Sequence, residues 1–190
     1  MSTSRFETAE QSDADKFARQ RVIRGSLWFT VPGTYALLGA AYAAFPPLAG
    51  MTGPSERLVL TAQWLLVAFI PYAAVCMTIL YQRYAEGAHN PLLGGESEGL
   101  KIHCRVMQNT LEQFLWFGLC ILSLSTFLSP GQVRLVPILC AFFALARFVY
   151  WWGYFRRGTL GRSPGVQLTF SLNILVFMMA LVLFARNLLS

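Results

Sequence analysis

The sequence predicts an all-α integral membrane protein in which five helices cross the bilayer. Of its 190 residues, 55% are hydrophobic and only 13% are charged, which is unusual for a soluble domain. The apolar residues form five continuous runs of about 20 residues or more, long enough for a helix to cross about 30 Å of hydrocarbon. Continuous rather than alternating runs favour helices over strands. The runs are residues 26–45, 58–82, 106–133, 135–155 and 163–185.

Three regions follow one another along the chain. Residues 1–25 form a polar tail with both signs of charge, expected to lie beside the lipid headgroups and to be partly disordered at its start. Residues 26–46 are predicted to be an extra transmembrane helix, which is rich in Ala and Gly and contains Pro32. Residues 57–190 are predicted to form a membrane domain of four helices.

The basic residues sort by side when five crossings are assumed. The tail and the connections 83–105 and 156–162 then share one side, and they carry five, three and three of the fifteen Lys and Arg residues. The other side has Arg57, Arg134 and Arg186. By the positive-inside rule the N-terminus is expected in the cytoplasm. We therefore interpret the net charge of +6 as a signal of membrane topology. The basic residues do not form a stripe interleaved with aromatic residues, so the sequence predicts no nucleic-acid partner.

The cysteines and histidines predict no metal site. The four cysteines have no CxxC spacing, and His89 and His103 lack companions at the spacing that metal ligands need on a helix. We interpret the cysteines as small apolar residues of membrane helices.

The stretch RVMQNTLEQF, residues 105–114, places polar groups at the start of an apolar run. Arg105, Asn109 and Glu112 are spaced by four and then three residues, which stacks them along one side of a helix, with Gln108 beside them. A carboxylate in hydrocarbon costs about 2.5–3.5 kcal/mol on insertion scales. Glu112 is therefore expected to face protein, water or a ligand.

The run 135–155 has a matching face formed by Arg147, Tyr150 and Tyr154. Helical rise places Arg147 about 13 Å and Glu112 about 10 Å into their helices, at comparable depth. One interpretation is a structural ion pair between Glu112 and Arg147 that fixes how the two helices meet. The other is a pocket for a small charged molecule, in which arginines bind anionic groups and Glu112 binds an ammonium.

The stretch RRGTLGRSPG, residues 156–165, is a basic connection that ends in a helix start, with Pro164 expected in the first turn. Arg162 is therefore predicted beside a helix N-terminus, where backbone dipoles favour an anion. A ligand thiol placed there would have a lowered pKa, because the guanidinium and the dipole stabilise the thiolate.

These two stretches resemble the MAPEG family, the membrane-associated proteins of eicosanoid and glutathione metabolism. The first family pattern is R-x-x-x-N-x-x-E-x-F, read here from Arg105 to Phe114. The second is R-x-x-Y-x-x-G-Y followed by a basic loop, read here as RFVYWWGYFRRGTLGR from Arg147 to Arg162. The resemblance covers roughly residues 57–190, so that residues 1–46 have no counterpart in the four-helix pattern.

The resemblance implies a four-helix bundle that assembles as a homotrimer and holds glutathione between subunits near the cytosolic side. It implies that Tyr150 and Tyr154 act from the neighbouring subunit, that Arg83 and Arg156 hold carboxylates, and that Arg162 stabilises the glutathione thiolate. The candidate binding residues are Arg83, Arg105, Asn109, Glu112, Arg147, Tyr150, Tyr154 and Arg156, and the candidate catalytic residue is Arg162.

The implied function is a membrane glutathione transferase or peroxidase, whose thiolate attacks a hydrophobic electrophile or a lipid hydroperoxide. The co-substrate is expected to come from the bilayer, either a bacterial inner membrane or the endoplasmic reticulum. The alternative within the family is a non-catalytic protein that binds and presents lipid, like the five-lipoxygenase-activating protein. A small transporter is a weaker alternative, because no inverted repeat is visible in the sequence.

Overall fold

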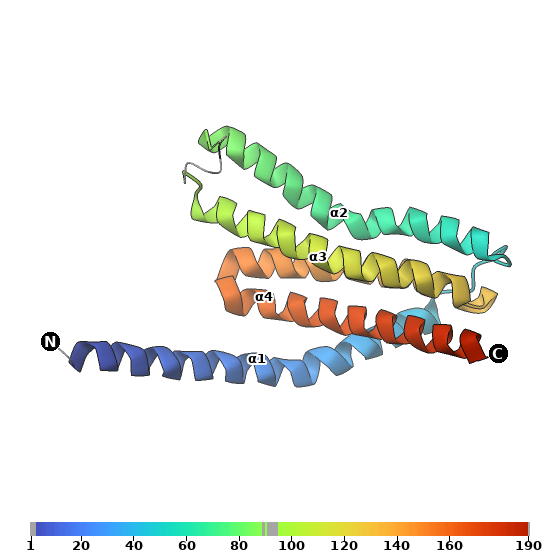
Figure 1. The fold of residues 1–190 in the computed structure, drawn as a ribbon, viewed down its shortest axis with the longest axis horizontal. Coiled ribbons are helices and arrows are strands. Elements are labelled where there is room, and N and C mark those ends of the chain that lie inside the picture. The colour runs from blue at the N-terminus through green and yellow to red at the C-terminus, as the bar shows by residue number, and fades with distance from the viewer. Residues whose placement is uncertain (1–2, 89, 91–94, 190) are drawn as a thin grey trace.

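The computed structural model describes residues 3–88, 90 and 95–189 and shows a bundle of long helices (Figure 1). The helices are α1 (Thr3–Ala44), α2 (Pro54–Glu86), α3 (Glu98–Phe127) and α4 (Leu135–Leu189), with a short 3-10 helix at Pro130–Gln132 before α4. α4 folds back on itself at Arg157 and Gly158. The two halves of α4 pack with α2 and α3, and α1 lies along the outside of the second half (Figure 1).

Four helices in the described residues are long and apolar enough to cross a membrane. They are Pro54–Glu86, Glu98–Phe127, Pro130–Gly158 and Leu160–Leu189, and they correspond to the last four predicted runs. The first run, residues 26–45, lies in α1, which is helical from Thr3 and so includes most of the polar tail. The fifth crossing stays a prediction.

Local signals in the sequence set the ends of α2 and α3. Pro54 opens α2, where the Glu56 carboxylate accepts hydrogen bonds from the backbone N–H groups of Thr52 and Gly53 at 2.8 and 3.0 Å. Gly87 ends α2 with a φ of 66°, a conformation that favours glycine. Ser97 caps α3 by accepting a hydrogen bond from the Leu100 N–H at 3.2 Å.

The fold-back of α4 depends on glycine. Gly158 has a φ of 57° and a ψ of −138°, which L side chains rarely adopt. A Cβ on Gly161 would overlap the Gly153 carbonyl, and a Cβ on Gly165 would overlap the Tyr150 backbone. The two halves of α4 therefore approach at backbone contact, as small residues allow between membrane helices.

The N-terminus, the α2–α3 connection and the α4 fold-back lie at the same end of the molecule (Figure 1). These are the three segments in which the basic residues are concentrated. At the opposite end Arg57 joins two connections, because its guanidinium donates to the Met51 carbonyl at 3.3 Å, to that of Thr52 at 2.6 Å, and to that of Leu128. Between the two ends the core is apolar, with Phe117 and Phe143 stacked at 4.7 Å.

Candidate functional site

Arg147 is buried in the bundle and is held by neutral groups. Its side chain is 1% exposed. Its Nη2 donates to Asn109 Oδ1 and to Thr110 Oγ1, each at 3.0 Å, and its Nη1 donates to Thr169 Oγ1 at 3.4 Å. The guanidinium also lies 4.1 Å over the ring of Tyr150. Arg147 thus joins α3 to both halves of α4.

The alternative of an ion pair between Glu112 and Arg147 is wrong. Thr110 and Gln113 face the interior of the bundle, whereas Glu112 is on the exposed side of α3. Two residues along a helix turn the side chain by about 200°, so Glu112 points away from the arginine that Thr110 contacts. Helical rise predicts the depth of the two groups, and it does not determine the direction of Glu112 around α3.

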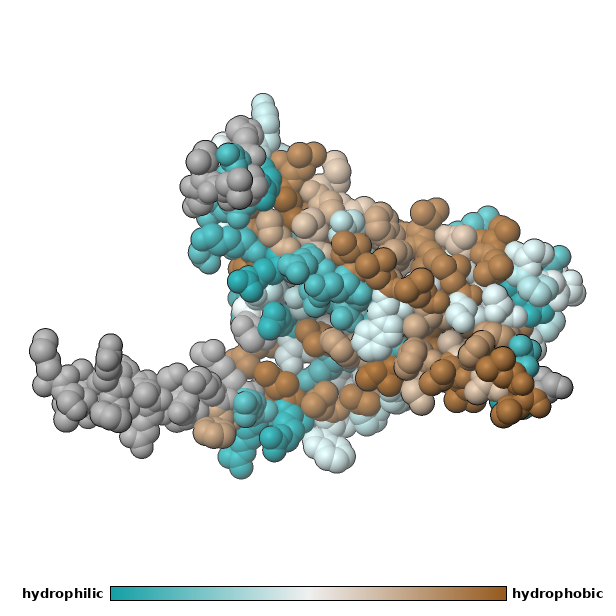
Figure 2. Space-filling view, in the orientation of Figure 1, coloured by the Kyte–Doolittle hydropathy of each residue, from teal (hydrophilic) through white to brown (hydrophobic). Residues whose placement is uncertain are grey.

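Arg105, Gln108 and Glu112 form a polar outward face on α3. All three are exposed, and Gln108 Nε2 donates to Glu112 Oε1 at 3.2 Å. Figure 2 shows hydrophilic residues gathered over this half of α3, between apolar surfaces. Asn109 lies at the border of this face, half-buried, with its amide oxygen turned to Arg147. The predicted row of Arg105, Asn109 and Glu112 is therefore divided between the surface and the interior.

A stack of side chains leads from Arg147 to Arg162. Tyr150 is buried, and its ring centre lies 5.9 Å from that of Tyr154, one turn further along α4. The Arg162 guanidinium lies 5.0 Å over the Tyr154 ring from the other half of α4. The glycine contacts described above bring these two halves together. Arg162 lies in the first turns of the second half, as the sequence predicts, although Pro164 falls inside the helix.

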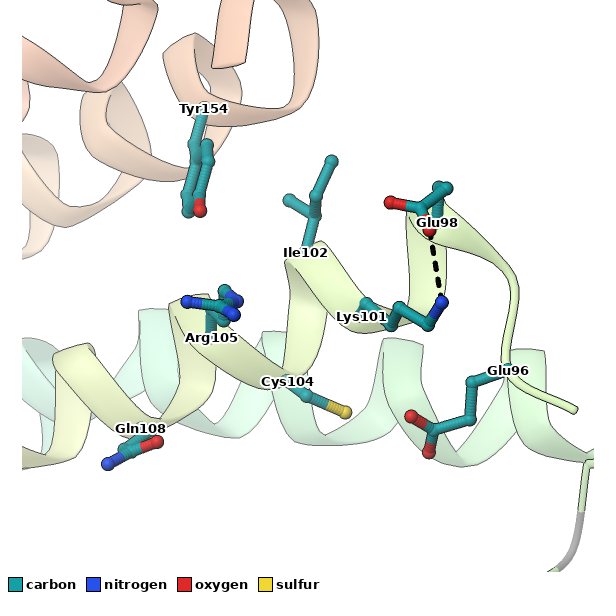
Figure 3. A pocket seen from close by; sticks show the side chains of 8 residues that line it. All are labelled: Glu96, Glu98, Lys101, Ile102, Cys104, Arg105, Gln108 and Tyr154. Atoms are coloured by element: carbon teal, nitrogen blue, oxygen red, sulfur yellow. Dashed lines mark hydrogen bonds and ion pairs between the residues drawn. The ribbon is translucent and has the colours of Figure 1, made fainter. Parts of the chain in front are cut away.

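A cleft of about 530 Å³ opens between α3 and the end of the first half of α4 (Figure 3). Tyr154 points toward α3 across the cleft from Arg105. Charges of both signs line it, since Glu98 pairs with Lys101 at 3.0 Å. The lining residues are Glu96, Glu98, Lys101, Ile102, Cys104, Arg105, Gln108 and Tyr154. One chain thus brings Arg105 and Tyr154 to a single cleft, although the resemblance placed the tyrosine in a neighbouring subunit.

Two residues predicted to hold carboxylates, Arg83 and Arg156, do not line the cleft. Arg83 is on α2 and forms an ion pair with Glu96 at 2.6 Å, so that it holds a protein carboxylate at the rim. Arg156 is exposed and lies 4.9 Å over the ring of Trp152. Among the described residues, no group of three or more His, Cys, Asp and Glu side chains could hold a metal ion.

The sequence alone does not identify every residue that positions Arg147. Thr110 and Thr169 are ordinary helix residues in the sequence, yet both supply oxygens to Arg147. The close approach of Gly153 to Gly161 has a sequence signal in the small residues at 153, 161 and 165. No sequence signal predicts the contacts of the two threonines, because these contacts depend on how each helix is rotated about its axis.

Comparison with known protein families identifies the family of the chain. The sequence model of the MAPEG family matches residues 59–182, which include most of α2, all of α3 and most of α4. The match contains every candidate site residue from Arg83 to Arg162. No curated protein matches the chain.

Proposed function

The chain belongs to the MAPEG family and is an integral membrane protein, with four helices in its described part that are long and apolar enough to cross a membrane. From this premise we propose that it is a membrane glutathione transferase. Reduction of lipid hydroperoxides by the same thiol is the related activity we expect. The main support for the proposal is that the groups of the site adjoin one another. The polar face of α3 borders the cleft, Tyr154 lines the cleft, and Arg162 lies over the Tyr154 ring.

The charges of the cleft suit a tripeptide with two carboxylates and one ammonium. Lys101 and Arg105 supply cations for carboxylates, and the carboxylates of Glu96 and Glu98 can accept from an ammonium. A volume of about 530 Å³ is within the usual range of about 300–1,000 Å³ for small-molecule pockets. Glutathione is thus the proposed co-substrate, bound at the end of the bundle that we place in the cytoplasm.

The exposed carboxylate of Glu112 supports an assembly of several copies, which the family resemblance implies is a homotrimer. A charged group on the lipid-facing surface would cost about 2.5–3.5 kcal/mol, so a second copy of the chain is expected to cover this side of α3. In that assembly the bound tripeptide would lie between subunits, with Glu112 and Gln108 facing it.

Arg162 is the proposed catalytic residue. Its guanidinium and the backbone N–H groups at the start of the second half of α4 stabilise the thiolate, and the thiol proton passes to water. With an aryl chloride, the sulfur–carbon bond forms, the carbon–chlorine bond breaks and chloride leaves. With a hydroperoxide, the thiolate attacks the terminal oxygen and releases an alcohol, and a second glutathione then yields the disulfide and water.

The Arg162→Ala variant tests the catalytic assignment. We expect kcat for conjugation of 1-chloro-2,4-dinitrobenzene to fall about 100-fold, as when one transition-state donor is removed, while the Kd for glutathione changes little. Arg186→Ala, an exposed arginine in the last turn of α4, is the matched control and should keep full activity. An unchanged kcat in Arg162→Ala would remove this residue from the mechanism.

Calorimetric titration with glutathione separates the enzyme from a lipid-presenting protein of the same family. We expect saturable binding to the protein in lipid nanodiscs, and weaker binding in Arg105→Ala, because a cation for a carboxylate is lost. Absence of binding at millimolar glutathione would overturn the proposed function and favour lipid presentation.

A further inference from the structure

A second cavity, of about 420 Å³, lies between α1 and the second half of α4. These two elements run side by side in Figure 1. Ile23, Leu27 and Val31 form the wall on α1, and Val166, Phe170 and Ile174 face them from α4. These six side chains are apolar, in contrast to the charged lining of the cleft on α3.

Polar contacts fix α1 against this part of α4. Gln167 is 6% exposed, and its Nε2 donates to the Ile23 carbonyl at 3.1 Å and to Ser26 Oγ at 2.7 Å. Further along, the Tyr35 hydroxyl donates to the Ser171 carbonyl at 3.5 Å. Two anchors more than two turns of α1 apart hold the helix in register, so the cavity has a defined wall.

Arg162 links the apolar cavity to the polar cleft through Tyr154. It lines the apolar cavity, and its guanidinium lies over the ring of Tyr154, which lines the polar cleft. A thiolate stabilised by Arg162 would therefore lie where the polar and the apolar space meet. This arrangement suits a reaction between a charged tripeptide and an apolar partner.

We propose that the cavity between α1 and α4 binds the hydrophobic electrophile and that α1 determines which electrophiles fit. This inference rests on the proposed glutathione transferase function, for which it names the acceptor site. α1 lies outside residues 59–182, the part that matches the family, so one wall of the site is supplied by a segment additional to the family pattern. The volume, the mainly apolar lining and the arginine in its wall favour a compact aryl or alkenyl electrophile with an apolar tail.

Photolabelling tests the site without depending on glutathione. The probe is an aryl chloride with a short alkyl diazirine tail, used with the full-length protein in phosphatidylcholine nanodiscs. We expect labelled peptides at residues 23–31 and 163–174, and loss of this label when excess unlabelled aryl chloride is present. Label spread over the lipid-facing surface, and not reduced by competition, would overturn the acceptor site even if glutathione binds.

A pair of variants on α1 tests whether this helix sets acceptor specificity. Leu27→Trp fills the cavity, whereas Leu37→Trp makes the same change at a position on α1 that is 59% exposed and away from the cavity. We expect Leu27→Trp to raise the KM for the same alkyl-tailed aryl chloride about tenfold, with the glutathione Kd unchanged. Leu37→Trp should match the wild type. Equal KM values for the two variants would overturn the role of α1.

Discussion

Arg147 shows how a charged side chain is accommodated inside a membrane bundle. Its neighbours in the described part of the chain are amide and hydroxyl oxygens and an aromatic ring, and each offers partial negative charge without a second ion to desolvate. The sequence predicts that Arg147 and Asn109 take part in one site, and the structure confirms that they touch. It does not predict Thr110 as a partner, because a hydroxyl is unremarkable in an apolar run.

Thr110→Val is the residue-scale test of this network. Valine keeps the shape of threonine but removes the oxygen that accepts from Nε and Nη2 of Arg147, so buried donors lose their partner. We expect the free energy of unfolding to fall by about 1–2 kcal/mol, the range measured for polar contacts between model membrane helices. Unfolding in mixed detergent micelles at fixed protein concentration measures the change.

Thr126→Val is the control for that measurement. Thr126 is on the same helix, and its hydroxyl donates only to the carbonyl of Ser123, one turn away. We expect its free energy of unfolding to stay within about 0.5 kcal/mol of the wild-type value, as for most surface substitutions. If both valine variants lose the same stability, the contact of Thr110 with Arg147 is not the cause.

Among the elements, α4 contributes to the site from both of its halves, since it supplies Tyr154 before the fold-back and Arg162 after it. The basic, glycine-containing turn could be predicted, because RRGTLGRSPG breaks the apolar pattern. The length of this turn could not be predicted from the sequence. Only Arg157 and Gly158 leave the helical conformation, because the glycines on both sides let the two halves meet almost at once.

Gly165→Ala tests whether this close approach positions the site. The new methyl group would overlap backbone atoms of Tyr150, which cannot move aside as a flexible side chain would. We expect a loss of about 1–3 kcal/mol in unfolding free energy, as for overpacked cores, together with a lower kcat for conjugation, because Arg162 would move from Tyr154.

A glycine-to-alanine substitution at a second buried position separates the overlap with Tyr150 from any general effect of alanine on stability. Gly118 is also buried in a helix, but a Cβ there would lie 3.8 Å from a Leu65 side-chain carbon, an ordinary contact. Gly118→Ala should therefore keep or slightly raise stability, because alanine favours the helix. Equal thermal stability of the two alanine variants would refute the role assigned to Gly165.

At the scale of the whole molecule, the sequence predicts the membrane class and the order of the helices well. Long uncharged runs leave few alternatives, and the three basic segments do lie at one end (Figure 1). Rotation of each helix about its axis is harder to predict. The apolar runs are hydrophobic on every side, so the pattern does not say which side meets protein and which meets lipid or another subunit.

A substitution of Glu112 tests which side of α3 meets protein, because the two possible environments predict different effects on stability. If its side of α3 faced lipid, Glu112→Leu would stabilise the protein by about 2.5–3.5 kcal/mol, the cost of the exposed charge. If a second copy and bound glutathione cover it, the same change should leave stability no higher and weaken glutathione binding by about 1.5–3 kcal/mol, since a charge-assisted hydrogen bond is lost. We expect the second result, with Glu112→Gln intermediate because an amide can still contact Gln108. Native mass spectrometry of the wild-type protein released from nanodiscs should show three copies, and a monomeric wild-type protein would exclude the trimer.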